Sequence, residues 1–517
     1  MIRMTRTTVA AALAVLLLPA SLSFAQMRPG AKTEKTYGLG LPRDMDKLIF
    51  DDKDYPEFPL KADQQAYKDI DGYRIKETLK KFTGIALKSF DDGEQYWGRI
   101  TGTKYDKMTT ELMAEEYQKL GLTIRREAFT IPKLWYPTHW EASYSTSVQG
   151  GGGKTGSLLT TFPINETVAT PKAGITADAV WVGVGSNADL VGRDLKGKAV
   201  IIYSIFVPGG RSHSASDRAG LFNSNTLATK AGAAMIINVM AVPGNGQFNP
   251  EGAPTGAGAV PTMSISQDEG FLLRDMIASG QKVQISLKLD IEERENVASQ
   301  NIYATLPGKS DEQIFVMTHT DCFFQGAMDN ASGMATAIEL ARHYAAVPQA
   351  QRPRTMVFVA TPDHHHGETG RDFMIKNYDW SKVALVLNAE HTSQTLLYMV
   401  NADLMTSNAV SARRWFASGS PVFQQLVKKT LKDFNVSVYK QAETRAGGSL
   451  GAVSPYAPSF HIIDHVIYHT TLDTPELVPA VGLTYSARAF AKILDETNKM
   501  SMADIRGTAK LPNPIKE

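Results

Sequence analysis

Four side chains that could bind a metal ion lie in the second half of the chain, each after a short apolar segment. They are His319, Asp329, Glu390 and His469. All of the eleven histidines except His139 and His213 fall between His319 and His469, so imidazole groups are concentrated in the same region. Zinc favours imidazole nitrogen and carboxylate oxygen, and a catalytic zinc site keeps one position open for water. Burial as a satisfied polar group would explain any one of these residues equally well, but the four together favour a metal site.

Two neighbours of His319 belong to the same candidate site. Asp321 lies two residues further along the predicted strand, so its side chain points to the same face. Its carboxylate could hold the imidazole of His319 in the tautomer that a metal needs, a supporting role common around metal-bound histidines. Cys322 is the single cysteine, so no disulfide can form within the chain. We interpret it as a small filler at the strand end, with ligation by its thiolate as the lesser alternative.

The elements that carry these residues are predicted from hydrophobic patterning. Apolar runs at 313–317, 355–360 and 382–387 predict buried strands. Amphipathic stretches at 332–347 and 486–496 predict helices. Strands that alternate with helices favour an α/β fold, with a mostly parallel mixed sheet and helices on both faces. Ligands of such sheets bind at the carboxyl ends of the strands, which is where the polar residues fall.

Four motifs resemble the co-catalytic zinc aminopeptidase family, which also holds carboxypeptidase Q, glutamate carboxypeptidase and the glutaminyl cyclases. The motifs are His319-Thr320-Asp321, Gly326-Ala327-Met328-Asp329-Asn330-Ala331-Ser332-Gly333, Asn388-Ala389-Glu390 and Tyr468-His469-Thr470-Thr471-Leu472-Asp473-Thr474. The resemblance implies a zinc exopeptidase-like fold and two zinc ions, with a single ion as the alternative. It also implies that Asp329 bridges the two ions, that His319 and Glu390 are the other ligands of one ion, and that His469 is a ligand of the other.

One motif departs from the family pattern. After the strand at 355–360 the family has two adjacent glutamates, of which the first is the general base and the second a metal ligand. Aligning the glycines that follow puts His364 and His365 in those places, whereas a register one residue earlier would put Asp363 and His364 there. Histidine is a good zinc ligand, so we predict that His365 completes the ligand set of the second ion.

The replaced general base leaves several interpretations open. A neutral His364 can accept a proton near pH 7, and adjacent metal charge would keep the ring neutral. Asp363 or Glu368 could supply the base instead. The trio His364-His365-His366 could also be a metal-rich loop without a catalytic role. We take His364 as the predicted base and Asp321 as the second catalytic residue.

The N-terminus has the features of a targeting segment. Residues 1–25 contain a charged start, an apolar core at 9–19 that is too short to span a bilayer, and small residues before a cleavage position. This pattern predicts a signal peptide and an exported protein, periplasmic or secreted. Since no other stretch is long and apolar enough to span a bilayer, no membrane span is expected after cleavage.

The remaining chain divides by composition into an arm, a split catalytic domain and an insertion. Residues 26–60 have little periodicity and predict an N-terminal surface arm. Residues 61–162 and 290–517 are expected to form the zinc-peptidase-like domain. Between them, 163–289 changes to short strands and turns. Three stretches of this insertion resemble, in order, the β-rich protease-associated domain, a non-catalytic module often inserted into exopeptidases: 194–202, 230–237 and 260–266.

Length and charge set further limits. A chain of 517 residues exceeds what one core usually supports, which favours two domains. A hydrophobic fraction of 43% with 21% charged residues is ordinary for a soluble globular protein. The net charge of +1 argues against a dedicated nucleic-acid binder.

The sequence therefore predicts an exported metal-dependent hydrolase of peptide or related amide bonds, aminopeptidase-like, with zinc-activated water as the nucleophile. Its expected partner is a peptide or a small amide substrate. Two alternatives remain. One is a catalytically silent binding protein with the same fold, and the other is a mononuclear zinc amidase or cyclase that acts on a non-peptide amide.

Overall fold

The structure, a computed structural model, describes residues 49–148, 151–204, 223–250, 253–254, 256–400, 403–463, 467–508 and 511–515. The predicted signal peptide at 1–25 and most of the predicted arm lie outside the described residues. Among the residues described, no helix is both long enough and apolar enough to cross a membrane.

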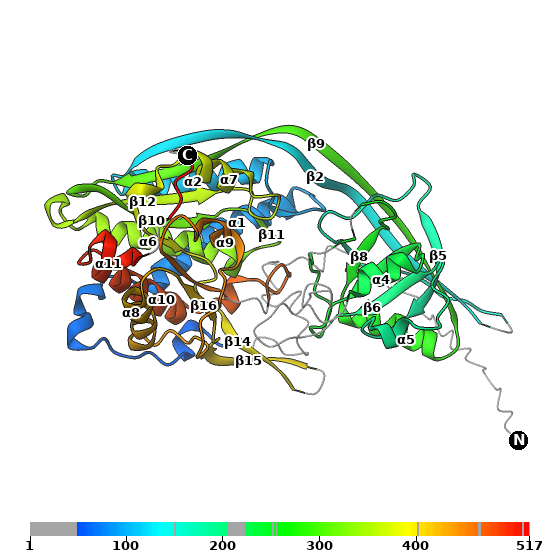
Figure 1. The fold of residues 1–517 in the computed structure, drawn as a ribbon. Coiled ribbons are helices and arrows are strands. Elements are labelled where there is room, and N and C mark those ends of the chain that lie inside the picture. The colour runs from blue at the N-terminus through cyan, green and yellow to red at the C-terminus, as the bar shows by residue number, and fades with distance from the viewer. Residues whose placement is uncertain are drawn as a thin grey trace, which may run out of the picture.

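The candidate site lies on a mostly parallel mixed sheet (Figure 1). Its strands run in the order β16 (Arg414–Ala417), β17 (Ser459–Ile463), β13 (Val383–Asn388), β10 (Ser310–His319), β12 (Arg354–Thr361) and β9 (Lys282–Leu306). The four central strands, β17 to β12, are parallel, whereas β16 and β9 pair antiparallel at the two sides. The predicted fold class is confirmed in this sheet.

Alternation along the strands explains why both faces of the sheet are covered. On β10, Ile314 and Val316 join one buried apolar cluster, whereas Phe315 and Met317 join another on the opposite face. The first cluster is covered by α1 (Gly72–Asp91), α2 (Lys104–Lys119), α6 (Gly333–Ala345), α8 (Pro421–Asp433) and α10 (Ala480–Thr497). The second is covered by α7 (Thr369–Asn377) and α9 (Gly448–Val453).

The start of α1 shows how closely two of these helices pack. Asp71 caps the helix by accepting a hydrogen bond from Tyr73 N. A Cβ atom on Gly72 would lie only 1.9 Å from the carbonyl oxygen of Ala480, the first residue of α10. Because only a residue without a side chain fits there, Gly72 allows the two helix ends to touch.

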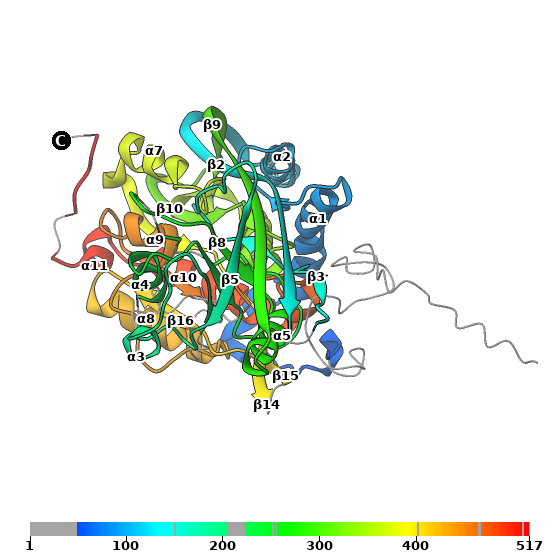
Figure 2. The ribbon, with the colours of Figure 1, turned by 90° about the vertical axis from the view of Figure 1, so that its right-hand side faces the viewer.

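A long two-stranded ribbon leads away from this sheet. β2 (Thr123–Ser147) and β9 each have 25 residues and pair antiparallel along their whole length. At one end β9 pairs with β12, and at the other it pairs with β5 (Ile175–Trp181). Figure 1 shows the ribbon arching over the top of the molecule, and Figure 2 shows it from the side, in front of the sheet that carries the candidate site.

The ribbon ends in a second body, which we call the outer domain. It consists of the described residues between 155 and 279 with the adjoining ends of β2 and β9, and four of its strands, β5 to β8, are parallel. Besides β5, its elements are β3 (Thr155–Ser157), β4 (Phe162–Pro163), α3 (Asn187–Leu190), β6 (Ala199–Tyr203), α4 (Ser224–Lys230), β7 (Met235–Val239), β8 (Thr262–Ile265) and α5 (Gln267–Ala278). The predicted insertion at 163–289 falls on this body, and its assignment as a protease-associated domain stays a prediction.

A few small elements complete the described chain. β1 (Gly98–Arg99) pairs with β11 (Cys322–Phe323) beside the candidate site. β14 (Thr395–Val400) and β15 (Asp403–Val410) form a separate hairpin, and α11 (Met502–Arg506) follows α10.

Candidate metal centre

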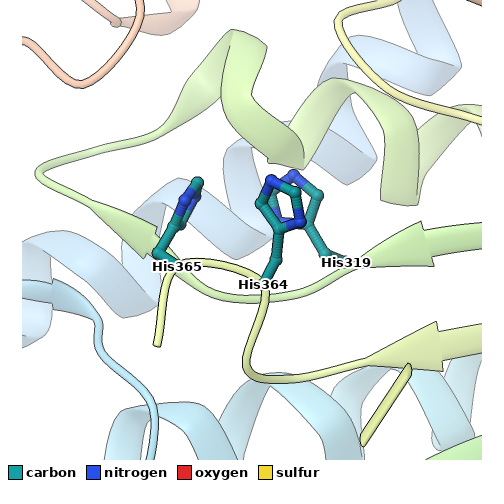
Figure 3. A group of neighbouring side chains, drawn as sticks. All are labelled: His319, His364 and His365. Atoms are coloured by element: carbon teal, nitrogen blue, oxygen red, sulfur yellow. The ribbon is translucent and has the colours of Figure 1, made fainter. Parts of the chain in front are cut away.

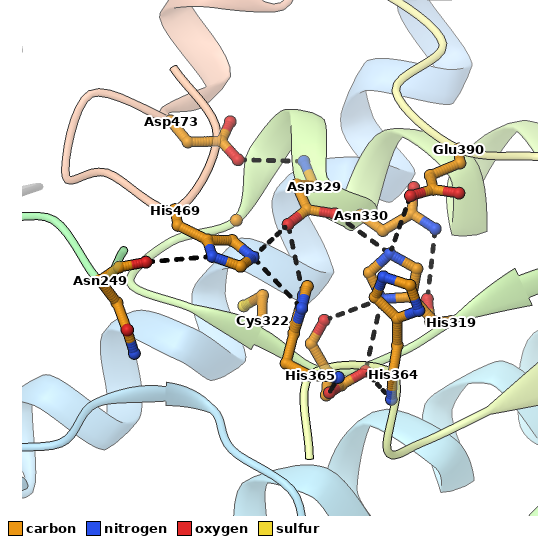
Figure 4. A network of polar contacts seen from close by, with 12 residues as sticks. Asn249, His319, Cys322, Asp329, Asn330, His364, His365, Glu390, His469 and Asp473 are labelled. Atoms are coloured by element: carbon orange, nitrogen blue, oxygen red, sulfur yellow. Dashed lines mark hydrogen bonds and ion pairs between the residues drawn. The ribbon is translucent and has the colours of Figure 1, made fainter. Parts of the chain in front are cut away.

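The structure brings the five residues predicted as metal ligands together at the carboxyl ends of the strands. His319 ends β10, His365 follows β12 and Glu390 follows β13. Asp329 lies in the turn η5 (Ala327–Ser332) that leads into α6, and His469 lies in the loop after β17. All five side chains are buried. Figure 4 shows their polar groups pointing toward one another around Asp329.

The ligand atoms form two groups that share Asp329. Within each group these atoms lie within 4.8 Å of one another. In the first, His319 Nε2 is 3.1 Å from Asp329 Oδ1 and 3.9 Å from Glu390 Oε1. In the second, His365 Nε2 and His469 Nε2 lie 3.3 and 3.5 Å from Asp329 Oδ2. The two oxygens of one carboxylate therefore face two separate sets of donors.

This donor set fits metal ions. His319 Nε2, Asp329 Oδ2 and His365 Nε2 are buried and make no hydrogen bond in the described part of the chain. A buried polar atom without a hydrogen-bond partner costs about 1–3 kcal/mol, so three such atoms in one cluster favour a site that binds an ion. Imidazole nitrogens and carboxylate oxygens in this combination suit zinc.

The electrostatics of the site also favour a cation. Burial alone would raise the pKa of Asp329, but the surrounding histidines hold it well below its usual value. Burial likewise opposes ionisation of Glu390, yet His391 and other histidines lower its pKa to about 2. Burial would lower the pKa of His319, but the neighbouring carboxylates of Asp321 and Asp329 raise it to about 10. Ionised carboxylates attract a divalent cation, which can displace the proton of a neighbouring imidazolium.

His364 lies at the edge of this cluster. Its ring stacks on that of His319, with centroids 4.2 Å apart, and it forms a third possible ligand group with His319 and His365 (Figure 3). His364 Nδ1 shares a hydrogen bond of 2.7 Å with Ser449 Oγ and lies 3.3 Å from Glu368 Oε1. Burial and the neighbouring charge of His319 lower the pKa of His364, which favours the neutral ring. The geometry thus allows His364 to accept a proton or to bind an ion.

The carboxylate of Asp321 ties two loops of the site together. Asp321 Oδ1 lies 3.3 Å from His319 Nδ1 and accepts a hydrogen bond from His364 N at 3.1 Å. Asp321 Oδ2 accepts one from His365 N at 2.8 Å. The predicted contact with the imidazole of His319 is present, and the carboxylate additionally fixes the backbone that carries the next two histidines. A group engaged in this way positions other residues rather than transferring protons.

The contacts of the loop after β12 favour one of the two registers considered above. His365, and not His364, lies in the group with Asp329 and His469. Asp363, which the earlier register would make the base, instead accepts a hydrogen bond from Gly370 N at 3.0 Å, in the first turn of α7. The glycine-based alignment therefore agrees with the geometry, and the Asp363 carboxylate serves the start of α7.

Two further residues contact Asp329 and were not given a role by the sequence. Asp473 accepts hydrogen bonds from Met328 N at 2.5 Å and Asp329 N at 3.0 Å, which holds the turn that presents the shared carboxylate. His391 Nε2 lies 2.9 Å from Asp329 Oδ1. Asp473 stands in the same motif as His469, four residues on, which was a usable signal. His391 follows Glu390 directly, and no pattern indicated that its ring turns toward Asp329.

A mixed α/β sheet with a buried cluster of histidines and carboxylates at the carboxyl ends of its strands is typical of metallopeptidase-like hydrolases. Comparison with protein families supports this class. Residues 301–491, which include all five candidate ligands, match the model of peptidase family M28. This part of the chain is therefore similar to that family.

The curated relatives are distant and match part of the chain. Aminopeptidase YwaD of Bacillus subtilis is 26% identical over 270 residues, which are 51% of this chain and 51% of the relative. Carboxypeptidase Q of Rattus norvegicus is 23% identical over 304 residues, which are 56% of this chain and 61% of the relative. The matches thus span roughly half of the length of these relatives.

Solved structures share the fold over most of the chain. A peptidase M28 precursor from Shewanella amazonensis superposes with a TM-score of 0.65 at 18% identity, covering 87% of this chain and 97% of the other. The zinc aminopeptidase BSAP from Bacillus subtilis gives a TM-score of 0.59 at 18% identity, covering 85% of this chain and 99% of the other. At this level of identity the likeness confirms the fold class.

Proposed function

We propose that this chain is an exported zinc-dependent hydrolase of peptide or related amide bonds, aminopeptidase-like in its chemistry. The observation that carries the proposal is the pair of ligand groups that share Asp329. Paired metal sites with a common carboxylate suit hydrolysis, because they can hold a nucleophile and a carbonyl oxygen side by side.

The proposed ligands follow the two groups. His319, Asp329 and Glu390 would hold one zinc ion, and Asp329, His365 and His469 would hold the other. Bound zinc would lower the pKa of water and polarise the carbonyl of the substrate. Asp321 would keep His319 in place and anchor the backbone of the β12 loop.

His364 is the proposed general base in place of the usual glutamate. If its Nδ1–H donates to Ser449 Oγ, with Glu368 Oε1 a further 3.3 Å neighbour of Nδ1, the lone pair of Nε2 is left to accept a proton from water. The protonated ring can then give that proton to the leaving amine. Ser449 Oγ, 2.7 Å from Nδ1, helps to fix the ring in this orientation.

One observation favours a second candidate function. His364 also lies in a possible ligand group with His319 and His365. If His364 binds an ion, the site has no base at the usual position. The chain would then be a binding protein with the same fold or a mononuclear zinc enzyme for a non-peptide amide.

Export remains part of the proposal. It depends on the targeting features of residues 1–25, which lie outside the described residues. The relatives named above include an aminopeptidase and a carboxypeptidase. The substrate test below would show which end of a peptide this chain attacks.

The first test is turnover of a panel of amide substrates by the full chain freed of its signal peptide. The panel should contain aminoacyl anilides, dipeptides and N-terminal glutaminyl peptides, so that aminopeptidase, dipeptidase and cyclase activities are separated. We expect hydrolysis that a chelator abolishes and added zinc restores. Turnover that is insensitive to chelation would contradict the proposal, and no turnover by protein that holds zinc would favour the binding protein.

A further inference from the structure

We propose that the outer domain forms part of the metal centre, because it fixes His469 and thereby controls the affinity of the second ion. The inference rests on the proposed function, since it presumes that two ions bind. It differs from the sequence-based interpretation of the insertion, which treated this segment as a non-catalytic module.

The central contact is a pair of hydrogen bonds between His469 and the backbone of Asn249. The carbonyl oxygen of Asn249, in the outer domain, lies 3.1 Å from His469 Nδ1 (Figure 4). Asn249 N donates in return to the carbonyl oxygen of His469 at 2.9 Å. A carbonyl at Nδ1 requires a proton on that nitrogen, so the Nε2 lone pair is left for an ion. His469 Nε2 is the atom that points toward Asp329 and His365.

The neighbouring residues extend this contact into a short antiparallel pairing. Phe248 and Thr470 face each other across it. Gln247 N donates to Thr471 Oγ1, and Thr471 N donates to the carbonyl oxygen of Gln247, both at 3.0 Å. We call residues 247–249 and 469–471 the interdomain bridge. Three successive residue pairs hold the loop of His469 against the outer domain.

The outer-domain side of the bridge is anchored to β8 of that domain. Ser264, on β8, donates from Oγ to the carbonyl oxygen of Phe248 at 2.6 Å. The Phe248 side chain is fully buried. The bridge is therefore held by β8, and a shift of this strand would be transmitted to His469.

A separate contact reaches the other histidine of the second group. Asn165 Nδ2, in the outer domain, donates to the carbonyl oxygen of His365 at 3.2 Å. In the described part of the chain, no hydrogen bond or ion pair joins the outer domain to His319 or Glu390. The outer domain thus contacts the second ligand group and not the residues that belong only to the first.

This asymmetry predicts that loss of these contacts lowers the affinity for one ion alone. Loss of a group that orients a metal-binding histidine typically lowers metal affinity about 10–100-fold. We therefore assign Asn249, Asn165 and Thr471 as positioning residues for the second ion. If these residues served folding alone, their substitution would weaken the binding of both ions or of neither.

The test is stepwise zinc binding to metal-free full chain, measured by calorimetry. Thr471→Val removes the hydroxyl that accepts from Gln247 N, and Asn165→Ala removes the amide at His365. For each variant we expect the dissociation constant of one ion, the one held by Asp329, His365 and His469, to rise about 10–100-fold, with that of the other ion unchanged. Thr176→Val is the matched control, because among the described residues its hydroxyl hydrogen-bonds with Ser286 Oγ alone, at 2.8 Å, on the ribbon.

Each outcome decides the inference. Unchanged affinities in both variants, or an equal loss for both ions, would overturn it while leaving the proposed function intact. Wild-type protein that binds no zinc would overturn the proposed function itself, and this inference with it. Asn165→Ala and Thr471→Val act on different histidines, so if one variant fails to fold, the other still gives an answer.

Discussion

Replacing Asp329 by alanine is expected to remove both metal ions and to lower kcat/KM for an amide substrate by at least about 10³-fold. Both ligand groups contain this one carboxylate, so its loss leaves each group with two donors. Metal ions supply several kcal/mol of transition-state stabilisation, and about 4 kcal/mol corresponds to about 10³-fold in rate. Metal content and turnover of the same preparation are the measurements.

Asp69→Ala is the matched control for this variant. Asp69 also pairs with a histidine, His343, at 2.9 Å, but its side chain is exposed to solvent and distant from the site in sequence. We expect Asp69→Ala to keep both ions and full turnover. If Asp329→Ala kept two ions per chain, the sharing of Asp329 between the groups would be wrong.

Replacing His364 by alanine is expected to lower kcat by about 10²–10⁴-fold while both ions remain bound. This range is the typical contribution of a positioned general acid or base. The expectation follows from the neutral ring, its hydrogen bond with Ser449 and its place beside His319. Because the ring is absent from both groups that contain Asp329, its loss should spare metal binding.

Two companion variants make this prediction specific. Asp363→Asn removes the competing carboxylate but keeps an oxygen for Gly370 N, so turnover should stay within about tenfold of wild type, well short of the loss of a general base. His364→Glu supplies the carboxylate found in the family that the motifs resemble, and should recover part of the activity lost in His364→Ala. Full activity in His364→Ala would exclude His364 as the base. Loss of an ion in that variant would identify His364 as a ligand and favour the second candidate function.

The central part of the fold was predictable because short patterns determine it. The apolar runs at 313–317, 355–360 and 382–387 became β10, β12 and β13, since a strand buried on both faces needs a continuous apolar segment. The helix expected at 332–347 is α6, which ends two residues earlier. The convergence of the candidate ligands followed from the same elements, because parallel strands end at one edge of the sheet.

The ribbon of β2 and β9 could not be predicted in the same way. The middle of β9 is largely exposed to solvent and carries charged residues, so it lacks the apolar pattern that predicts a strand. Glu292, Glu293 and Glu295 are exposed on β9, where a solvated two-stranded ribbon has no need for alternating apolar residues. Backbone pairing with β2, and not side-chain burial, maintains the strand there.

The contacts that orient the ligands also could not be predicted from the sequence. Asn249 acts on His469 through its backbone carbonyl, a group that every residue has, so no residue type signals the contact. The turn of the His391 ring toward Asp329 depends on a left-handed backbone conformation, with φ of 49°, at a residue that rarely adopts it. Spacing patterns identify candidate donors, whereas their orientation depends on tertiary packing.

The metal content of the purified wild-type chain tests the central claim most directly. Inductively coupled plasma mass spectrometry after gentle desalting would give the number of zinc ions per chain. The two groups around Asp329 predict close to two ions. A single ion would contradict the shared carboxylate and support the mononuclear alternative, and no ion after zinc is added back would contradict the metal centre altogether.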